Sequence, residues 1–149
     1  MKIYKQIVTT APEETEGVGA ELARAMLDGE LPSFVALEGD LGVGKTAFVR
    51  GFVSVVVPGA AVRSPTFALV NEYKNKDTAR AVYHFDVYRI VDEDDLYSTG
   101  FYDYIDKGIC LVEWSENIRY AFPKSYLAVR IEKNDPENTE SRLITVFQG

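Results

Sequence analysis

The sequence predicts an α/β fold in three layers, with a mixed, mainly parallel central sheet. Two continuous apolar runs of strand length, residues 34–38 and 109–112, are typical of parallel strands that are covered on both faces. Segments with helical spacing, residues 10–28 and 45–57, alternate with such runs, and the connections between them are short. Because 149 residues is the length of one domain, we expect residues 1–149 to fold as a single unit.

The first half of the chain is expected to form an edge strand, a helix, a buried strand and a second helix. Thr10 is placed to cap the first helix, with Pro12 in its first turn and Glu13 completing a capping box. In chain order, these elements span residues 3–8, 10–28, 34–38 and 45–57.

The second half is expected to form two strands around a polar turn, a helical segment, a buried strand and a closing hairpin. One or two short helices broken at Gly100 account for the helical segment, and a polar loop over residues 134–140 joins the hairpin strands. In chain order, these elements span residues 68–73, 81–85, 92–107, 109–112, 126–132 and 142–147.

The composition disfavours several kinds of site. The 23 acidic residues outnumber the 16 basic ones, so we do not expect the chain to grip nucleic acid directly, because phosphate contacts need a basic face. A single cysteine, Cys110, and a single histidine exclude an internal disulfide and a His/Cys metal cluster. Since no apolar run could span a bilayer and the start lacks a signal-peptide core, we expect a cytoplasmic protein without membrane contact.

The strongest chemical signal is a match to the phosphate-loop pattern G-x-x-x-x-G-K-[ST], preceded by an apolar strand and followed by an amphipathic helix. Glycines let consecutive backbone N–H groups point at one anion, and the helix start adds its dipole. We therefore expect a phosphate-loop NTPase-like fold that binds ATP and Mg²⁺, with the lysine on the phosphates and the threonine hydroxyl on the metal. The eight residues are Gly39, Asp40, Leu41, Gly42, Val43, Gly44, Lys45 and Thr46.

ATP is expected rather than GTP. Guanine-specific proteins of this class usually carry Asn-Lys-x-Asp at a strand end. The sequence Asn75-Lys76-Asp77-Thr78 has threonine at the last position, and it falls in a predicted turn. We interpret it as a solvated turn.

A phosphate-loop enzyme also needs a carboxylate at a neighbouring strand end to hold Mg²⁺ or its water shell. Glu113 directly follows the apolar run 109–112, at the sheet edge where ligands gather in open α/β folds. We therefore predict Glu113 as a metal ligand. Trp114 either packs in the core or lies against the nucleotide.

Polar residues alternate with apolar ones in the next segment. If it is extended, His84, Asp86 and Tyr88 share one face, whereas Phe85 and Val87 share the other. Asp86 could orient or deprotonate the water that attacks the γ-phosphate. Alternatively, Asp86 caps a turn and His84 is only a hydrogen-bonded core residue.

The segment Ser64-Pro65-Thr66-Phe67 lies where other phosphate-loop proteins have a mobile switch. Thr66 could sense Mg²⁺ or the γ-phosphate, with Arg63 supplying positive charge. The alternative is an ordinary proline turn. Cys110, inside an apolar strand, is expected to be a buried and inert thiol.

Four segments together, residues 39–46, 64–67, 84–89 and 113–116, make the chain resemble the TsaE family. These are small bacterial ATPases of tRNA threonylcarbamoyladenosine biosynthesis. The phosphate loop is shared by many enzymes, whereas the other three segments in this order are more specific. The resemblance extends over residues 9–146.

The resemblance implies weak ATP hydrolysis alone and action with the TsaB–TsaD heterodimer, whose turnover the ATP cycle supports. It implies that Lys45 binds phosphate, that Thr46 and Glu113 hold Mg²⁺ and that Asp86 is the catalytic carboxylate. Arg142 corresponds to a base-side contact in the closing hairpin. The tRNA would be reached only indirectly, through the partner complex, which agrees with the acidic composition.

Two other functions share the same loop. A phosphate-loop kinase for small molecules usually needs an arginine-rich lid, whereas the arginines of this chain are scattered. A nucleotide-dependent binding module without meaningful turnover needs the same loop and metal ligands, so the sequence does not separate it from a slow ATPase.

Overall fold

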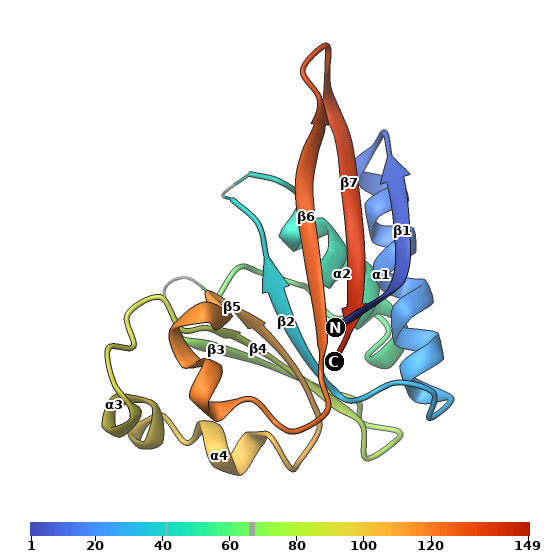
Figure 1. The fold of residues 1–149 in the computed structure, drawn as a ribbon. Helices are drawn as coiled ribbons and strands as arrows, with labels where there is room; N and C mark the ends of the chain where they lie inside the picture. Colours follow the sequence, from blue (N-terminus) through green and yellow to red (C-terminus); the bar gives the residue numbers. More distant parts are fainter. Residues whose placement is uncertain (41, 66–67) are drawn as a thin grey trace.

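The computed structural model describes residues 1–40, 42–65 and 68–149, and the strands of this part form one seven-stranded sheet (Figure 1). The order across the sheet is β1-β7-β6-β2-β5-β4-β3. In chain order the strands are β1 (Lys2–Thr9), β2 (Phe34–Glu38), β3 (Val70–Lys74), β4 (Ala81–Asp86), β5 (Ile109–Glu113), β6 (Leu127–Asp135) and β7 (Asn138–Gln148).

The sheet is mixed, as predicted, with its parallel part at the centre. Strands β6, β2, β5 and β4 are neighbours in that order and run parallel. β3 adds an antiparallel strand at one edge, and β7 and β1 add two at the other. The carboxyl ends of the four parallel strands therefore meet at one edge, where ligands collect in open α/β sheets.

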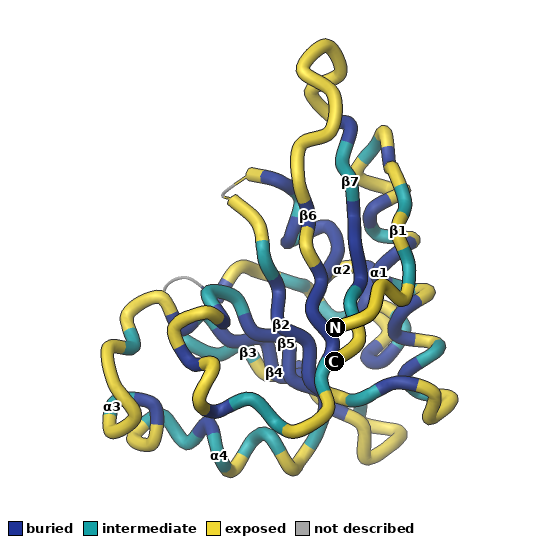
Figure 2. Tube along the Cα trace, in the orientation of Figure 1, coloured by how far each residue is buried: buried dark blue, intermediate teal, exposed yellow. Residues whose placement is uncertain are grey.

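Helices cover both faces of the sheet, which gives the predicted three layers. α1 (Pro12–Leu27) and α2 (Lys45–Val56) pack on one face, and α3 (Glu93–Ser98), α4 (Phe101–Tyr104) and the 3₁₀ segment η1 (Ser115–Ala121) pack on the other. Successive side chains of the central strands point to opposite faces, so each strand contributes residues to the hydrophobic cores on both sides of the sheet. Figure 2 shows the buried residues concentrated in these strands. In the described ranges, no helix has the length and apolar character needed to cross a membrane.

Helix α1 begins differently from the prediction. Its cap is Ala11, and the carboxylate that reaches back belongs to Glu14, which accepts from the Thr10 N–H at 2.9 Å and from the Thr10 hydroxyl at 3.2 Å. The predicted capping box of Thr10 and Glu13 is therefore wrong by one residue. The reason is geometric, because the glutamate of such a box lies three residues after the cap, and the cap has moved to Ala11.

The closing hairpin is longer than predicted. A polar loop was expected over residues 134–140, whereas β6 continues to Asp135 and β7 starts at Asn138. These residues are exposed, so hydrophobic alternation does not reveal them. Backbone pairing holds them instead, together with a hydrogen bond from the Asn134 amide to Ser141 Oγ. Figure 1 shows the hairpin extending beyond the other strands, and Figure 2 shows that its tip is exposed.

Two expectations about individual segments are confirmed. Cys110 is completely buried, and burial, with a smaller contribution from Asp106, raises the pKa of its thiol to about 12. The thiol is therefore protonated and inert at neutral pH. The segment from Asn75 to Thr78 is the turn between β3 and β4, and the N–H of Asp77 donates to Asn75 Oδ1 at 2.9 Å.

Helices α1 and α2 approach each other most closely at two glycines. A Cβ atom added at Gly51 would lie 1.8 Å from the backbone oxygen of Glu16, and one at Gly19 would lie 2.1 Å from that of Phe48. No side chain fits at these distances, so the glycines set the spacing between the helices. Because the last two residues of the phosphate-loop sequence form the start of α2, this contact also fixes the position of that end of the loop.

We predict that Gly51→Ala lowers the free energy of unfolding by about 3 kcal/mol, because overpacking here displaces a backbone. Gly17→Ala in α1 is the matched control, since a Cβ there meets nothing within 4 Å. That variant should be more stable than the wild type by about 0.5–1 kcal/mol. Urea denaturation of both variants measures the difference, and equal stabilities would contradict the close-approach argument.

Candidate functional site

The phosphate-loop sequence joins β2 to α2 at the carboxyl edge of the parallel strands. Gly39 has a φ of 143° and Gly44, the cap of α2, a φ of 103°, which side chains rarely adopt. A Cβ at Gly39 would also lie 2.5 Å from the backbone oxygen of Ile131. The path of the loop thus requires glycine, and the first N–H groups of α2 face it. Leu41, a predicted loop residue, lies outside the described residues.

Lys45 lies inside the site and not in solvent. It is only 8% exposed, and its Nζ donates to the backbone oxygen of Gly39 at 2.8 Å. The same nitrogen lies 3.5 Å from Oε1 of Glu113 and 6.0 Å from the centroid of the Trp114 ring. The structure therefore brings three predicted site residues together, one from the start of α2 and two from the end of β5.

The carboxylate of Glu113 lies between two basic side chains. Its Oε1 faces Lys45, and its Oε2 lies 2.6 Å from Nε2 of the fully buried His84, although the ring nitrogen is not aligned for a well-formed hydrogen bond. Burial acts to raise the pKa of Glu113, but the contact with His84 and the charge of Lys45 outweigh it, so the net pKa is lowered. Glu113 is therefore ionised at neutral pH, and His84 supports its orientation.

Asp86 ends β4 and is paired in register with Glu113 at the end of β5. The predicted alternation is confirmed within β4, because His84 lies beside Glu113 whereas Phe85 packs in the core on the opposite face of the sheet, but the strand ends at Asp86 and Tyr88 lies in the following turn. Asp86 Oδ1 accepts from the backbone N–H of Tyr88 at 2.9 Å, so Asp86 does cap a turn. This bond uses one carboxylate oxygen, and the catalytic role of Asp86 stays a prediction.

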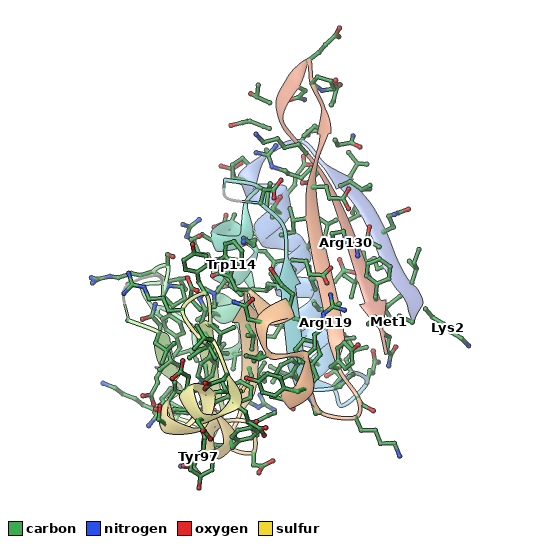
Figure 3. All side chains as sticks on the ribbon, turned by 60° about the vertical axis from the view of Figure 1, so that its left-hand side comes forward. Met1, Lys2, Tyr97, Trp114, Arg119 and Arg130 are labelled. Atoms are coloured by element: carbon green, nitrogen blue, oxygen red, sulfur yellow. The ribbon has the colours of Figure 1, made fainter. Side chains whose placement is uncertain are left out.

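Trp114 borders a cavity of about 620 Å³ beside the loop. The residue is half-buried with a φ of 61°, and its ring packs on that of Tyr88 with the centroids 4.8 Å apart. Trp114 directly precedes η1 and Arg119 lies within it, and Figure 3 labels both residues. The volume is in the range of small-molecule sites. The sequence pattern does not single out Glu116 or Arg119, although both follow Glu113 closely. The cavity is lined by Leu37, Glu38, Gly39, Asp40, Lys45, Trp114, Glu116 and Arg119.

Arg142 contacts the phosphate-loop backbone from β7. Its Nε donates to the carbonyl of Val43 at 2.8 Å, and its Nη2 donates to that of Gly42 at 3.3 Å. Its Nη1 donates to two carbonyls of its own hairpin, those of Thr139 at 2.7 Å and Ser141 at 2.9 Å. The structure thus brings Arg142 to the loop, while a contact with the base stays a prediction.

A magnesium ion fits the oxygen ligands that the site offers. Thr46 follows Lys45 in the first turn of α2, and Glu113 supplies an ionised carboxylate beside the Lys45 ammonium. Mg²⁺ is usually held by one or two protein oxygens together with water and phosphate. Within the described residues no three His, Cys, Asp or Glu side chains gather, so a metal cage built from protein alone is not found there. Thr66 and Phe67 of the predicted switch lie outside the described residues.

The sequence of this chain matches one known protein family over most of its length. Residues 9–143 match the family described as threonylcarbamoyl adenosine biosynthesis protein TsaE. The chain belongs to the TsaE family. The resemblance indicated by the four sequence segments is therefore confirmed, and the family is one of tRNA threonylcarbamoyladenosine biosynthesis.

Individual relatives agree with this assignment. The Bacillus subtilis tRNA threonylcarbamoyladenosine biosynthesis protein TsaE is 36% identical over 133 residues, which cover 89% of this chain and 80% of its own. The protein of the same name from Haemophilus influenzae is 40% identical over 68% of this chain and 63% of its own. A crystal structure of Bacillus subtilis YdiB matches with a TM-score of 0.66 at 32% identity, covering 98% of this chain and 86% of that one. The predicted phosphate-loop NTPase-like fold is thereby confirmed.

We predict that Glu113→Ala is destabilised by about 1–3 kcal/mol, because it removes the group that faces the buried His84. Glu113→Gln keeps the shape and an oxygen, so it should unfold closer to the wild type. Because the pKa of Glu113 is lowered from its ordinary value of 4.5, the ionised carboxylate stabilises the fold fully at pH values above 4.5. This contribution is lost as the pH falls from 4.5 through the lowered pKa.

The measurement is urea denaturation of wild type, Glu113→Ala and Glu113→Gln at pH 7 and at pH 4. The difference between wild type and the glutamine variant should shrink at the lower pH. A difference that grows on acidification would contradict the lowered pKa.

Proposed function

We propose that this TsaE-family member is a Mg²⁺-dependent ATPase of tRNA threonylcarbamoyladenosine modification, acting in the cytoplasm with the TsaB–TsaD complex. One observation carries the proposal above all: Lys45 at the loop and Glu113 at the end of β5 lie 3.5 Å apart, nearly buried, beside a cavity. A phosphate-binding cation and a metal-binding carboxylate need this proximity, because Lys45 would contact the phosphates and Glu113 would hold the Mg²⁺ that neutralises their charge.

The phosphates of ATP would be held by the loop from Gly39 to Thr46. The glycine conformations bring backbone N–H groups to the start of α2, where the helix dipole favours negative charge. Lys45 supplies the positive charge, and its low exposure strengthens the interaction relative to one in solvent. Trp114 offers an aromatic surface at the border of the same cavity.

When bound, Mg²⁺ would neutralise charge on the phosphates and polarise the bond to be cleaved. Thr46 Oγ1 and a Glu113 oxygen would hold it. Glu113 is suited to this task because it is already ionised, and His84 limits its rotation from the opposite side. Fixing a ligand through a second residue is common at metal sites.

Asp86 is the group we propose for orienting the attacking water. It ends the strand next to Glu113, in register with it, so both carboxylates face the carboxyl edge of the sheet. Positioning accounts for most of what a protein contributes to phosphoryl transfer. The hydrogen bond from the Tyr88 N–H fixes one oxygen of Asp86 and thereby its rotamer.

The partner in this proposal is a protein complex, and the tRNA is reached through it. The net charge of −7 disfavours direct binding of a polyanion and suits a protein that acts on another protein. The names of the curated relatives, which refer to threonylcarbamoyladenosine biosynthesis, support the same pathway.

Lys45→Ala and Thr46→Ala should each abolish measurable MgATP binding, since one removes the phosphate contact and the other a metal ligand. Calorimetric titration with MgATP tests both. Lys133→Gln, an exposed hairpin lysine, is the control for loss of a positive charge and should bind as the wild type does. Wild-type affinity in Lys45→Ala would overturn the proposed function.

Asp86→Asn should bind MgATP normally and melt near the wild type, because asparagine keeps the oxygen that accepts from Tyr88. Its hydrolysis rate should fall by about 10²–10⁴-fold. Asp86→Ala loses the turn as well and should cost about 1 kcal/mol of stability in addition. Single-turnover hydrolysis and thermal melting on the same preparations separate the two roles. Normal hydrolysis by Asp86→Asn would leave Asp86 a turn residue only.

A further inference from the structure

The guanidinium of Arg142 is bonded almost entirely to backbone carbonyls. Its hydrogen bonds to Gly42, Val43, Thr139 and Ser141 use four of the five N–H groups that an arginine side chain has. All three nitrogens are engaged, and only one N–H of Nη2 is left over. Such a side chain is poorly equipped to read a base, but it is well equipped to hold a backbone.

The two loop carbonyls belong to consecutive peptide groups. The carbonyl of Gly42 shares its planar peptide group with the N–H of Val43, and the carbonyl of Val43 shares its group with the N–H of Gly44. In a trans peptide the C=O and N–H bonds point in opposite directions. Arg142 therefore fixes the direction of both N–H groups, which point away from the guanidinium.

Those two N–H groups belong to the segment expected to hold phosphate. In the described part of the chain, neither the Val43 nor the Gly44 N–H donates to a backbone or side-chain acceptor. Arg142 also acts electrostatically, because a cation on a carbonyl oxygen polarises the whole peptide group and strengthens its N–H as a donor. Both effects favour an anion in front of the loop.

We infer that Arg142 is a positioning residue of the phosphate site, which holds two loop peptides so that the N–H groups of Val43 and Gly44 are presented to the phosphate chain. This rests on the proposed function, because it concerns the same loop. A contact with the base would strengthen binding of the adenosine part of ATP. The positioning role of Arg142 would instead strengthen binding of the phosphates alone.

Lys133 provides a matched control in the same hairpin. It is the β6 residue paired with Arg142 in the strand register, and it is exposed. Lys133→Gln removes one positive charge from almost the same place without removing a bond to the loop. A general effect of charge on an anionic ligand would appear in both variants, whereas an effect of loop positioning would appear in Arg142→Gln alone.

The experiment is calorimetric titration of wild type, Arg142→Gln, Arg142→Lys and Lys133→Gln with MgATP and with inorganic tripolyphosphate. Arg142→Gln should lose about tenfold or more in affinity, by the same factor for both ligands, since it removes charge-assisted hydrogen bonds. Arg142→Lys should be intermediate, because an ammonium does not reproduce the planar fork. Lys133→Gln should stay within about twofold, as expected for a solvent-screened charge.

A second readout needs no ligand. In ¹H–¹⁵N spectra, Arg142→Gln and Arg142→Lys should shift the amide signals of Val43 and Gly44 while the signals of α4, on the opposite face of the sheet, stay in place. Weaker MgATP binding with unchanged tripolyphosphate binding would overturn the inference and make Arg142 a base contact. Unchanged affinity for both ligands in a folded Arg142→Lys would also overturn it. Wild-type protein that binds neither ligand would contradict the proposed function itself, and this inference with it.

Discussion

The contact between Lys45 and Glu113 is the interaction on which the rest of the site depends. It joins the first turn of α2 to the end of β5, at 3.5 Å between Nζ and Oε1. The parallel pairing of β2 with β5 makes it possible, because Leu37, close to the start of the loop, is the register partner of Glu113. Strand pairing thus brings the start of the loop and Glu113 to one edge of the sheet, and α2 then places Lys45 beside Glu113, which lies 68 positions further along the sequence.

A buried ionic contact of this kind needs support from both sides. Each charge loses water, so an isolated carboxylate would take up a proton or turn toward solvent. Here Lys45 also donates to the carbonyl of Gly39, and Glu113 also faces His84, so neither group depends on the other alone. The glycine contact between α1 and α2 adds a mechanical constraint, because it sets where α2, and with it Lys45, lies relative to the sheet.

The parts of this fold that local patterns determine could be predicted from the sequence. The phosphate loop, the buried strands and Glu113 at a strand end follow from spacing and apolar runs that act over a few residues. The start of α1 was missed by one residue because Thr10 and Glu13 have the spacing of a capping box, whereas the extended backbone conformation at Ala11 makes that residue the cap and Glu14 the residue that reaches back. The hairpin tip was missed because its strands are exposed and polar, so no buried face marks their period.

The role of Arg142 shows why other parts of the site were beyond prediction. Its partners, the carbonyls of Gly42 and Val43, lie about 100 positions away in sequence and carry no side-chain signature. The role of His84 could not be predicted for the same reason. It depends on the neighbouring strand, which places Glu113 beside the imidazole ring. Asp86 remained open between two roles for a different reason: a turn cap and a water-orienting carboxylate require the same residue at the same strand end.

The most direct test of the account is the rate of ATP hydrolysis by the wild-type protein, alone and with the TsaB–TsaD pair added. We expect slow, Mg²⁺-dependent release of phosphate by the protein alone and a faster rate when the partners are added. An unchanged rate on adding the pair would contradict the partner-coupled function. Transfer of the phosphate to a small molecule, with no release to water, would contradict hydrolysis itself and favour a kinase.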